Sequence, residues 1–256
     1  VREVNKTKPK SSQFYHSSLS SVHKYIPISE IHEFYTKNEN IKQTGGRSNA
    51  LKIMKQLSKF KHYEKERHIP SLDKTTHISA HLHFGTVSIR EFYWALHKTL
   101  GAHNAIIRQL AFRSMYLKVY ALHPELQRGV AFRKNIDEAI HWEKNPKYWK
   151  AWTTGQTGFP LVDAGMKQLI TTGFMHNRTR MVVASYLVKD CHAYWRWGER
   201  FYAQNLVDYD PAQNMMNWVG VSSLAPFGSA PFRRHDPERT EKRLDPTHEY
   251  VEKWLD

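Results

Sequence analysis

The feature that most constrains the fold is the spacing of apolar residues, which recur every three or four positions over three long stretches. The first stretch is 106–117, and its helix is expected to end at His123-Pro124. The second is 161–170, with a helix end expected at Gly173, and the third is 177–197. In the third, the residues expected to face inward are Met181, Val182, Tyr186 and Val188. Sustained alternation of apolar and polar residues is absent. The sequence therefore predicts an all-α fold.

The chain divides into two parts of different composition. Residues 1–43 are polar and basic with little periodicity, and we expect them to form a tail or linker. Residues 44–256 are expected to form one helical domain, which starts at the break marked by Gly45-Gly46. Within this domain the spacing predicts a further helix over 50–60. Residues 62–74 are expected to form a loop, with Pro70 as a stop signal.

The charge of the chain favours a polyanionic partner. Thirty-eight Lys and Arg stand against 24 Asp and Glu, a formal net charge of +14. Nucleic acid is the first candidate for such a partner. A basic protein without any nucleic-acid role is the alternative that charge alone leaves open.

The single cysteine, Cys191, excludes a disulfide framework and a cysteine-based zinc site. It fits a reducing, intracellular compartment, which means cytoplasm or nucleus. No apolar run approaches the roughly 20 residues that span a bilayer, so no membrane is expected. No signal-peptide pattern is found, although a chain that begins at Val1 leaves its native targeting open.

The histidines do not form a recognisable metal site. His77, His81 and His83 alternate in a way that a strand could use, but no carboxylate or cysteine completes a ligand set. A glycine-rich dinucleotide loop and a phosphate-binding P-loop are also missing. We therefore expect no bound metal.

A series of motifs resembles one known family. The run from Thr75 to Gly85, TTHISAHLHFG, is similar to the T-S-x-L-S-x-x-L-x-x-G segment of the DNA photolyase/cryptochrome family. Further similar runs follow in the family's order: WTTGQTG at 152–158, FPLVDA at 159–164, TGFMHNR at 172–178, SYLVKD at 185–190, WRWGE at 195–199, DYD at 208–210 and a tail at 237–254. The resemblance implies the helical, FAD-binding C-terminal domain of this family. The family's N-terminal α/β antenna domain has no counterpart, so a separate antenna chain is an open expectation.

The resemblance implies two groups of FAD-binding residues. The residues that match the phosphate and ribitol contacts are Tyr63, Thr75, Thr76, His77, Ile78 and Ser79, with His77 in place of a usual arginine. The residues that match the surroundings of the isoalloxazine are Asn177, Arg180, Asp208, Asp210 and Asn214. Arg180 would pair with Asp208, Asp210 would accept from the flavin ring, and Asn214 would lie near N5.

Three tryptophans match the family's electron-transfer chain. Trp218, Trp195 and Trp142 would carry electrons from the surface to photoexcited flavin, because indole is among the side chains most easily oxidised. Large aromatic residues in a helical protein also serve as core. Together with Asn214, these tryptophans are the expected catalytic residues.

The lesion pocket is where the sequence departs from the family. Residues that still match its substrate or DNA side are Arg67, Arg113, Asn177, Arg178 and Met181, together with the altered positions Gln109 and Phe112. Gln109 replaces a glutamate and Phe112 a stacking tryptophan, whereas Gly220 and Ile106 each replace a further tryptophan. The Met-His-Asn run at 175–177 looks more like cyclobutane pyrimidine dimer photolyases than (6-4) photolyases.

The expected function is light-driven repair of cyclobutane pyrimidine dimers in DNA by electron transfer from reduced FAD. Two alternatives stay open. One is a cryptochrome-like blue-light photoreceptor, which the altered lesion pocket favours. The other is one chain of a split photolyase.

Overall fold

The regular structure of the described residues is helical, as the sequence predicts. The computed structural model describes residues 36, 38–41, 43–225 and 233–256. In that part of the chain the one β pairing is an isolated bridge between Glu143 and Ala193. The predicted tail, 1–43, lies almost wholly outside the described residues. None of the described helices has the length and apolar character needed to cross a membrane.

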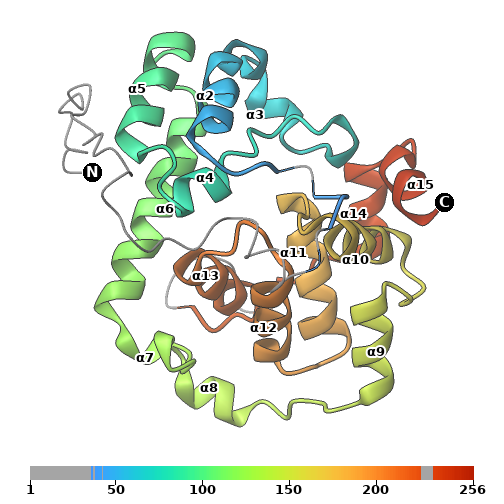
Figure 1. Ribbon diagram of the computed structural model, residues 1–256. Helices are drawn as coiled ribbons and strands as arrows, with labels where there is room; N and C mark the ends of the chain where they lie inside the picture. The colour runs from blue at the N-terminus through green and yellow to red at the C-terminus, as the bar shows by residue number, and fades with distance from the viewer. Residues whose placement is uncertain (1–35, 37, 42, 226–232) are drawn as a thin grey trace.

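The helices fall into two groups joined by one long helix (Figure 1). The first group consists of α2 (Arg47–Lys55), the 3₁₀ turn η3 (Leu57–Phe60), α3 (Tyr63–Glu66), the 3₁₀ turn η4 (Pro70–Leu72), α4 (Ser79–His83) and α5 (Ile89–Leu100). The joining helix is α6 (Ala105–Leu122). The second group consists of α7 (Pro124–Gln127), α8 (Lys134–Ala139), α9 (Pro146–Thr154), α10 (Pro160–Thr172), α11 (Asn177–Ser185), the π-helical turn Tyr186–Asp190, α12 (Trp195–Asn205), α13 (Pro211–Val221), α14 (Pro237–Leu244) and α15 (Glu249–Leu255).

Local sequence signals set several of the helix ends. Asn104 caps α6 by accepting from the backbone N–H groups of Ile106 and Ile107. Gly173 ends α10 with a φ of 68°, a conformation that glycine adopts without a steric penalty. Helix α6 ends at Leu122 with His123 as its C-cap, so the ends predicted for these two helices, at His123-Pro124 and Gly173, are confirmed.

Each group of helices has its own hydrophobic core. The N-terminal core consists of Ala50, Leu57, Ile78, Leu82, Val87, Phe92, Leu96, Ile106 and Leu110. The larger C-terminal core includes Trp152, Leu161, Met166, Leu169, Val183, Leu187, Trp195, Tyr202, Trp218 and Tyr250. Helix α6 supplies Ile106 and Leu110 to the first core, and its later residues Tyr116 and Tyr120 pack against the second. One helix thus fixes the separation of the two cores.

Three sequence predictions differ from the structure. The helix predicted over 177–197 is broken, because the π-helical turn follows α11 and a new helix starts at Trp195. Within it Val182 and Val188 are buried as expected, whereas Met181 and Tyr186 are only partly buried. The predicted loop at 62–74 contains the short turns α3 and η4. The helix predicted over 50–60 is divided into α2 and η3.

The histidine segment also differs from the strand-like pattern considered for it. His81 and His83 lie in α4, so their side chains do not alternate along a strand. In the described part of the chain, no three or more His, Cys, Asp or Glu side chains come together in a group that could hold a metal ion.

Helices α10 and α11 approach each other closely at Gly165. A Cβ atom added there would lie 2.4 Å from Cγ2 of Thr179 and 2.8 Å from Cγ2 of Val183. Both neighbours are β-branched and stiff about χ1, so they cannot swing away without repacking. The small residue in α10 is therefore a condition for this helix pair.

We predict that Gly165→Ala destabilises the protein by about 1–3 kcal/mol, the usual result of overpacking a dense core. The measurement is the free energy of unfolding in urea. Gly220→Ala in α13 is the matched control, because a Cβ atom there meets nothing within 4 Å. This control should be neutral or stabilising by about 0.5–1 kcal/mol. Equal effects of the two substitutions would contradict the close packing inferred at Gly165.

Candidate functional site

A cavity of ≈ 550 Å³ lies between the two cores. Its apolar wall comes from the N-terminal core and includes Ile78, Leu82, Phe92, Ile106 and Leu110. Its polar wall is formed by residues of α11, of α13 and of the segment that precedes α13. A volume of this size, apolar on one side and polar on the other, is typical of sites for small molecules and cofactors.

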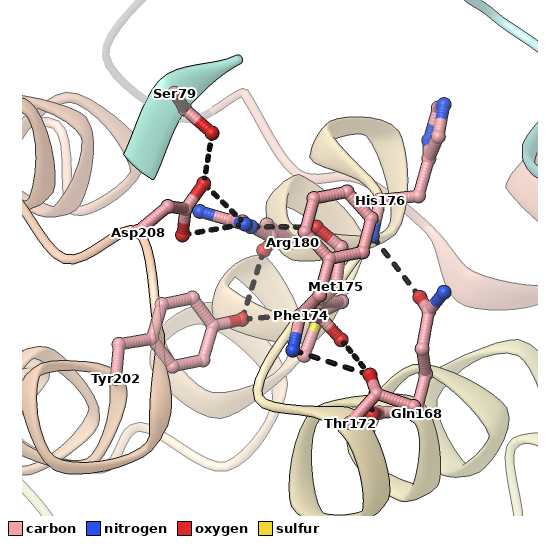
Figure 2. A network of polar contacts seen from close by, with 9 residues as sticks. All are labelled: Ser79, Gln168, Thr172, Phe174, Met175, His176, Arg180, Tyr202 and Asp208. Carbon is pink, nitrogen blue, oxygen red and sulfur yellow. Dashed lines mark hydrogen bonds and ion pairs between the residues drawn. The ribbon is translucent and has the colours of Figure 1, made fainter. Parts of the chain in front are cut away.

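Asp208, a residue of the polar wall, bonds to Ser79 and Arg180 in a network of polar contacts (Figure 2). Its carboxylate accepts two hydrogen bonds from Nη2 of Arg180, at 3.0 and 3.1 Å, and one from the hydroxyl of Ser79 at 2.7 Å. The side chain of Asp208 is only 6% exposed, so these bonds replace most of its contact with water. The carboxylate therefore connects α4 of the first group to α11 of the second.

The guanidinium of Arg180 is held from several sides. Its Nε donates to the carbonyl of Met175 at 2.7 Å, and the group lies 5.4 Å from the ring centroid of Phe174 (Figure 2). The hydroxyl of Tyr202 donates to the carbonyl of Arg180 at 3.3 Å. These contacts fix the orientation in which Arg180 meets Asp208.

Asp210 is the second carboxylate of the polar wall. One of its oxygens caps α13 by accepting from the N–H groups of Ala212 and Gln213. The other oxygen accepts from Nη2 of Arg113 at 2.9 Å and lies 3.4 Å from Nδ1 of His83. Arg113, predicted to face DNA, thus lines the cavity with its guanidinium on Asp210.

Asn214 follows one turn later on α13. Its amide donates to both the carbonyl and a carboxylate oxygen of Glu199, each at 3.0 Å. Burial raises the pKa of Glu199. Asn214 lines a smaller adjoining pocket that shares Asn177, Arg180, Asp208 and Asp210 with the cavity.

Residues that the sequence reasoning missed lie on the same face of α13. Gln213 and Asn217 line both the cavity and the adjoining pocket. Positions 210, 213, 214 and 217 follow the three- and four-residue spacing of one helix face. This spacing could have identified both residues once Asp210 and Asn214 were singled out.

The predicted phosphate segment lies along another side of the cavity. Tyr63, Thr75, Thr76, His77, Ile78 and Ser79 all line it. His77 has a φ of 51°, a left-handed conformation that costs energy for a residue with a Cβ atom. Two contacts hold it there, since Nε2 lies 2.7 Å from the Asp73 carboxylate and its ring is 4.6 Å from that of Phe174.

The residues predicted for the lesion lie at the same cavity, with one exception. Arg67, Gln109, Phe112, Arg113, Asn177 and Met181 line it, and Arg178 does not. Nε of Arg178 instead donates to Nδ1 of His68 at 2.9 Å. Phe112 is 47% exposed.

The three predicted electron-transfer tryptophans have different surroundings. Trp218 borders the adjoining pocket, and its ring centroid is 5.1 Å from that of Tyr202. It packs on Gly198 of α12 so tightly that a Cβ atom there would lie 2.1 Å from the indole. Trp195 begins α12 and is fully buried, whereas Trp142 is partly exposed.

Comparison with known proteins identifies the family. The family model for the FAD-binding domain of DNA photolyase matches residues 106–256, more than half of the chain. The chain belongs to the DNA photolyase family. It is 36% identical over 202 residues to the deoxyribodipyrimidine photo-lyase of Escherichia coli, a match that covers 75% of this chain and 42% of that protein.

Solved structures of this family share the fold. A bacterial class III photolyase of Agrobacterium tumefaciens superposes with a TM-score of 0.82 at 33% identity, covering 91% of this chain and 50% of that one. A cryptochrome of Synechocystis superposes with a TM-score of 0.78 at 27% identity, covering 88% of this chain and 49% of that one. The chain thus spans about half the length of the proteins it matches.

The residues present fit the FAD that this family binds. Ten of the eleven residues predicted for the cofactor line the cavity, and the eleventh, Asn214, lines the adjoining pocket. Hydroxyl and histidine side chains on one side suit a pyrophosphate, which needs hydrogen-bond donors. Amide, guanidinium and carboxylate groups on the other side suit the donors and acceptors of a flavin ring. The individual contacts remain predictions.

His176, which precedes α11, gives a prediction about pH. It is 2% exposed, and burial lowers its pKa to about 4 from an ordinary value of 6.5. As the pH falls through this window the unfolded chain binds a proton that the folded chain does not, so stability is lost. At about 1.4 kcal/mol per pKa unit, the loss should reach about 2 kcal/mol near pH 5.

The measurement is the unfolding free energy of the wild type and of His176→Asn from neutral pH down to about pH 5. Asparagine keeps an acceptor for the N–H of Arg178, which the histidine caps through Nδ1 at 3.2 Å. Because other histidines titrate equally in both proteins, the difference between the two curves reports His176 alone. Parallel curves would show that this imidazole does not stay neutral in the fold.

Proposed function

We propose that this domain, as part of a photolyase, repairs cyclobutane pyrimidine dimers in DNA with light, using reduced FAD as electron donor. The observation that carries the proposal is that one cavity is lined by most residues of both predicted sets, all but Asn214 for the cofactor and all but Arg178 for the lesion. Electron transfer requires the two to be adjacent, and a shared cavity supports that arrangement. When bound, excited reduced FAD supplies the electron that opens the dimer.

The polar wall would bind and orient the cofactor. The Arg180–Asp208 pair is already fixed by Ser79 and by the carbonyl of Met175, so it can present its remaining donors and acceptors without reorganisation. Asn214 has both amide hydrogens directed at Glu199, which leaves its carbonyl oxygen as the free acceptor. Such a preorganised set favours one orientation of the ring.

The lesion would enter from the side of Gln109 and Phe112. A dimer must leave the base stack to reach a cavity, and photolyases are among the enzymes known to flip bases. The exposed ring of Phe112 offers a stacking surface to a flipped base. The amide of Gln109 can hydrogen-bond a base edge, although it lacks the charge and the proton of a carboxylic acid.

Positive charge beside the cavity supports a DNA partner. Arg178 lies near Arg67 and Arg243, and burial together with these two cations lowers the pKa of its guanidinium. Holding these like charges close together costs electrostatic free energy, and a bound phosphate backbone would remove that cost. Binding should then weaken steeply with salt.

A second candidate, a cryptochrome-like photoreceptor, is favoured by one feature. At Gly220 a Cβ atom would meet nothing within 4 Å, so the position that carries a stacking tryptophan in repair enzymes faces open space. A pocket without this wall holds a dimer less firmly. A further proposed partner is an α/β antenna domain, which would correspond to the part of the relatives that this chain does not match and could be fused to it or form a separate chain.

The deciding experiment is a repair assay with photoreduced, FAD-loaded protein and ultraviolet-irradiated oligothymidine. We expect dimers to disappear under blue light and to persist in the dark. Flavin photoreduction without any loss of dimers would favour the photoreceptor. Co-purification with an α/β chain would identify a split photolyase.

We predict that Asp208→Asn lowers the affinity for FAD, because Arg180 loses its charged partner in a site with little water. Breaking a buried pair costs about 3–5 kcal/mol, and the partial exposure of Arg180 places the loss near the lower value. The measurements are the flavin-to-protein absorbance ratio and the dissociation constant. Glu64→Gln, which removes the exposed Arg108–Glu64 pair, is the control and should change little. Unchanged affinity in Asp208→Asn would contradict this role.

We also predict that the double substitution Gln109→Glu with Phe112→Trp increases the preference for dimer-containing over undamaged DNA. Base–aromatic stacking contributes about 1–3 kcal/mol per base, and the larger indole recovers part of it. A gain of up to roughly tenfold is expected, since 1.4 kcal/mol is a factor of ten. The measurement is competitive binding of damaged and undamaged oligonucleotides. A parent protein that discriminates better than the variant would show that this pocket recognises its lesion differently.

A further inference from the structure

Two of the predicted electron-transfer tryptophans share one carboxylate. Nε1 of Trp195 donates to Oδ1 of Asp137 at 3.1 Å, and Nε1 of Trp142 donates to the same oxygen at 3.1 Å. Trp142 also reaches the backbone carbonyl of Asp137 at 3.1 Å. An indole has a single polar hydrogen and no acceptor, so both indoles direct their only N–H at this residue.

The surroundings of Asp137 form a compact aromatic unit. The ring of Tyr194 adjoins both indoles, with its centroid 5.8 Å from that of Trp142 and 6.1 Å from that of Trp195. Asp137 belongs to α8, at the end of the molecule away from α2–α5 (Figure 1). Its side chain is half-buried, so it contacts the indoles on one side and solvent on the other.

The shared carboxylate matches the chemistry of an oxidised indole. An indole that has lost an electron carries a positive charge, and its N–H becomes acidic. A carboxylate in direct hydrogen-bond contact stabilises that charge and can take the proton. A neutral hydrogen-bond acceptor stabilises the positive charge less and takes the proton less readily.

We propose that Asp137 accepts the N–H proton of an outer tryptophan, Trp142 or Trp195, once that tryptophan has lost an electron. This proton transfer keeps the oxidised site on the outer tryptophans and prevents the electron from returning to them. The inference rests on the proposed function, because the oxidant is light-excited FAD that is not yet reduced, and the electron it takes from the tryptophans produces the reduced FAD that repair needs. One electron leaves an indole, its N–H bond breaks, and an O–H bond forms on Asp137. The products are a neutral indole radical and a carboxylic acid, which later loses its proton to water.

The charges around Asp137 support this role. Burial raises the pKa of its carboxyl group, which makes it a stronger base, while the two indole N–H groups and Arg196 act in the opposite direction. Arg196 lies over the Trp195 ring, 5.6 Å from its centroid, and Glu138 adjoins Asp137 in sequence. The tyrosine of the unit, Tyr194, has its pKa raised by burial and by Asp137.

The first test is laser-flash transient absorption of FAD-loaded Asp137→Asn. Asparagine keeps the size and one acceptor oxygen but loses the charge and the base. We expect the tryptophan radical to remain in its cation form, and the yield of photoreduced flavin to fall roughly tenfold, as a charged hydrogen bond becomes a neutral one. Asp137→Glu should restore part of the yield. Glu138→Gln, which removes the neighbouring exposed carboxylate, should match the wild type.

The second test needs no flavin excitation. In the dark, the indole ¹⁵N–¹H resonances of Trp142 and Trp195 should shift together as pH protonates Asp137, and in Asp137→Asn neither should titrate. Independent titration of the two resonances would overturn the shared contact. This measurement also reports whether the variant keeps its fold.

Trp218→Phe separates the two ways of failing. If this variant photoreduces its flavin like the wild type, the proposed tryptophan electron path is wrong, and the proposed role of Asp137 is wrong as well. If Trp218→Phe abolishes photoreduction while Asp137→Asn forms the neutral radical at the wild-type rate, the chain stands and Asp137 is not its proton acceptor.

Discussion

The carboxylate of Asp208 is the constraint on which the arrangement of the two helix groups depends. A buried carboxylate is costly unless charged or strongly polar partners replace water. Its partners come from both groups, since Ser79 starts α4 and Arg180 lies in α11. The C-terminal group supplies the ion pair through Arg180, and the N-terminal group supplies a third hydrogen bond through Ser79. The polar cluster therefore specifies how the N-terminal and C-terminal cores face each other, which hydrophobic contact by itself leaves free.

The cavity persists because its two walls cannot collapse onto each other. Apolar residues of the N-terminal core face charged groups that already have partners: Asp208 with Arg180, and Asp210 with Arg113. Closing the gap would press these ions against Ile106 and Leu110 and remove their remaining solvation. Helix α6 contributes to both cores and keeps them apart. A cofactor that is polar on one side and apolar on the other matches the two walls of such a gap.

The sequence predicts those features that local chemistry determines. Helix ends at Gly173 and His123 follow from residues that stop helices, and the apolar spacing predicts α6 and α10. The break after Ser185 is not predictable in this way, because the apolar pattern continues through the π-helical turn while the backbone changes. The cavity residues were found through motif resemblance, and most of them do meet there. Asp137 was missed since its partner Trp195 is 58 residues away, and only the folded chain brings them together.

Helix α13 shows how one segment can serve cofactor, electron path and core together. Its face at 210, 213, 214 and 217 borders the cavity or the adjoining pocket, and its opposite residues Met215, Met216 and Val219 fill the C-terminal core. Trp218 lies at the boundary, where it touches the pocket and packs on Gly198. Any shift of α13 would therefore change all three at once. Gly220 is different, since it lines neither the cavity nor the adjoining pocket and a Cβ atom there would meet nothing within 4 Å, so a change at this position need not move the flavin side. The departures of this chain from the family's lesion pocket are accordingly compatible with an intact cofactor site.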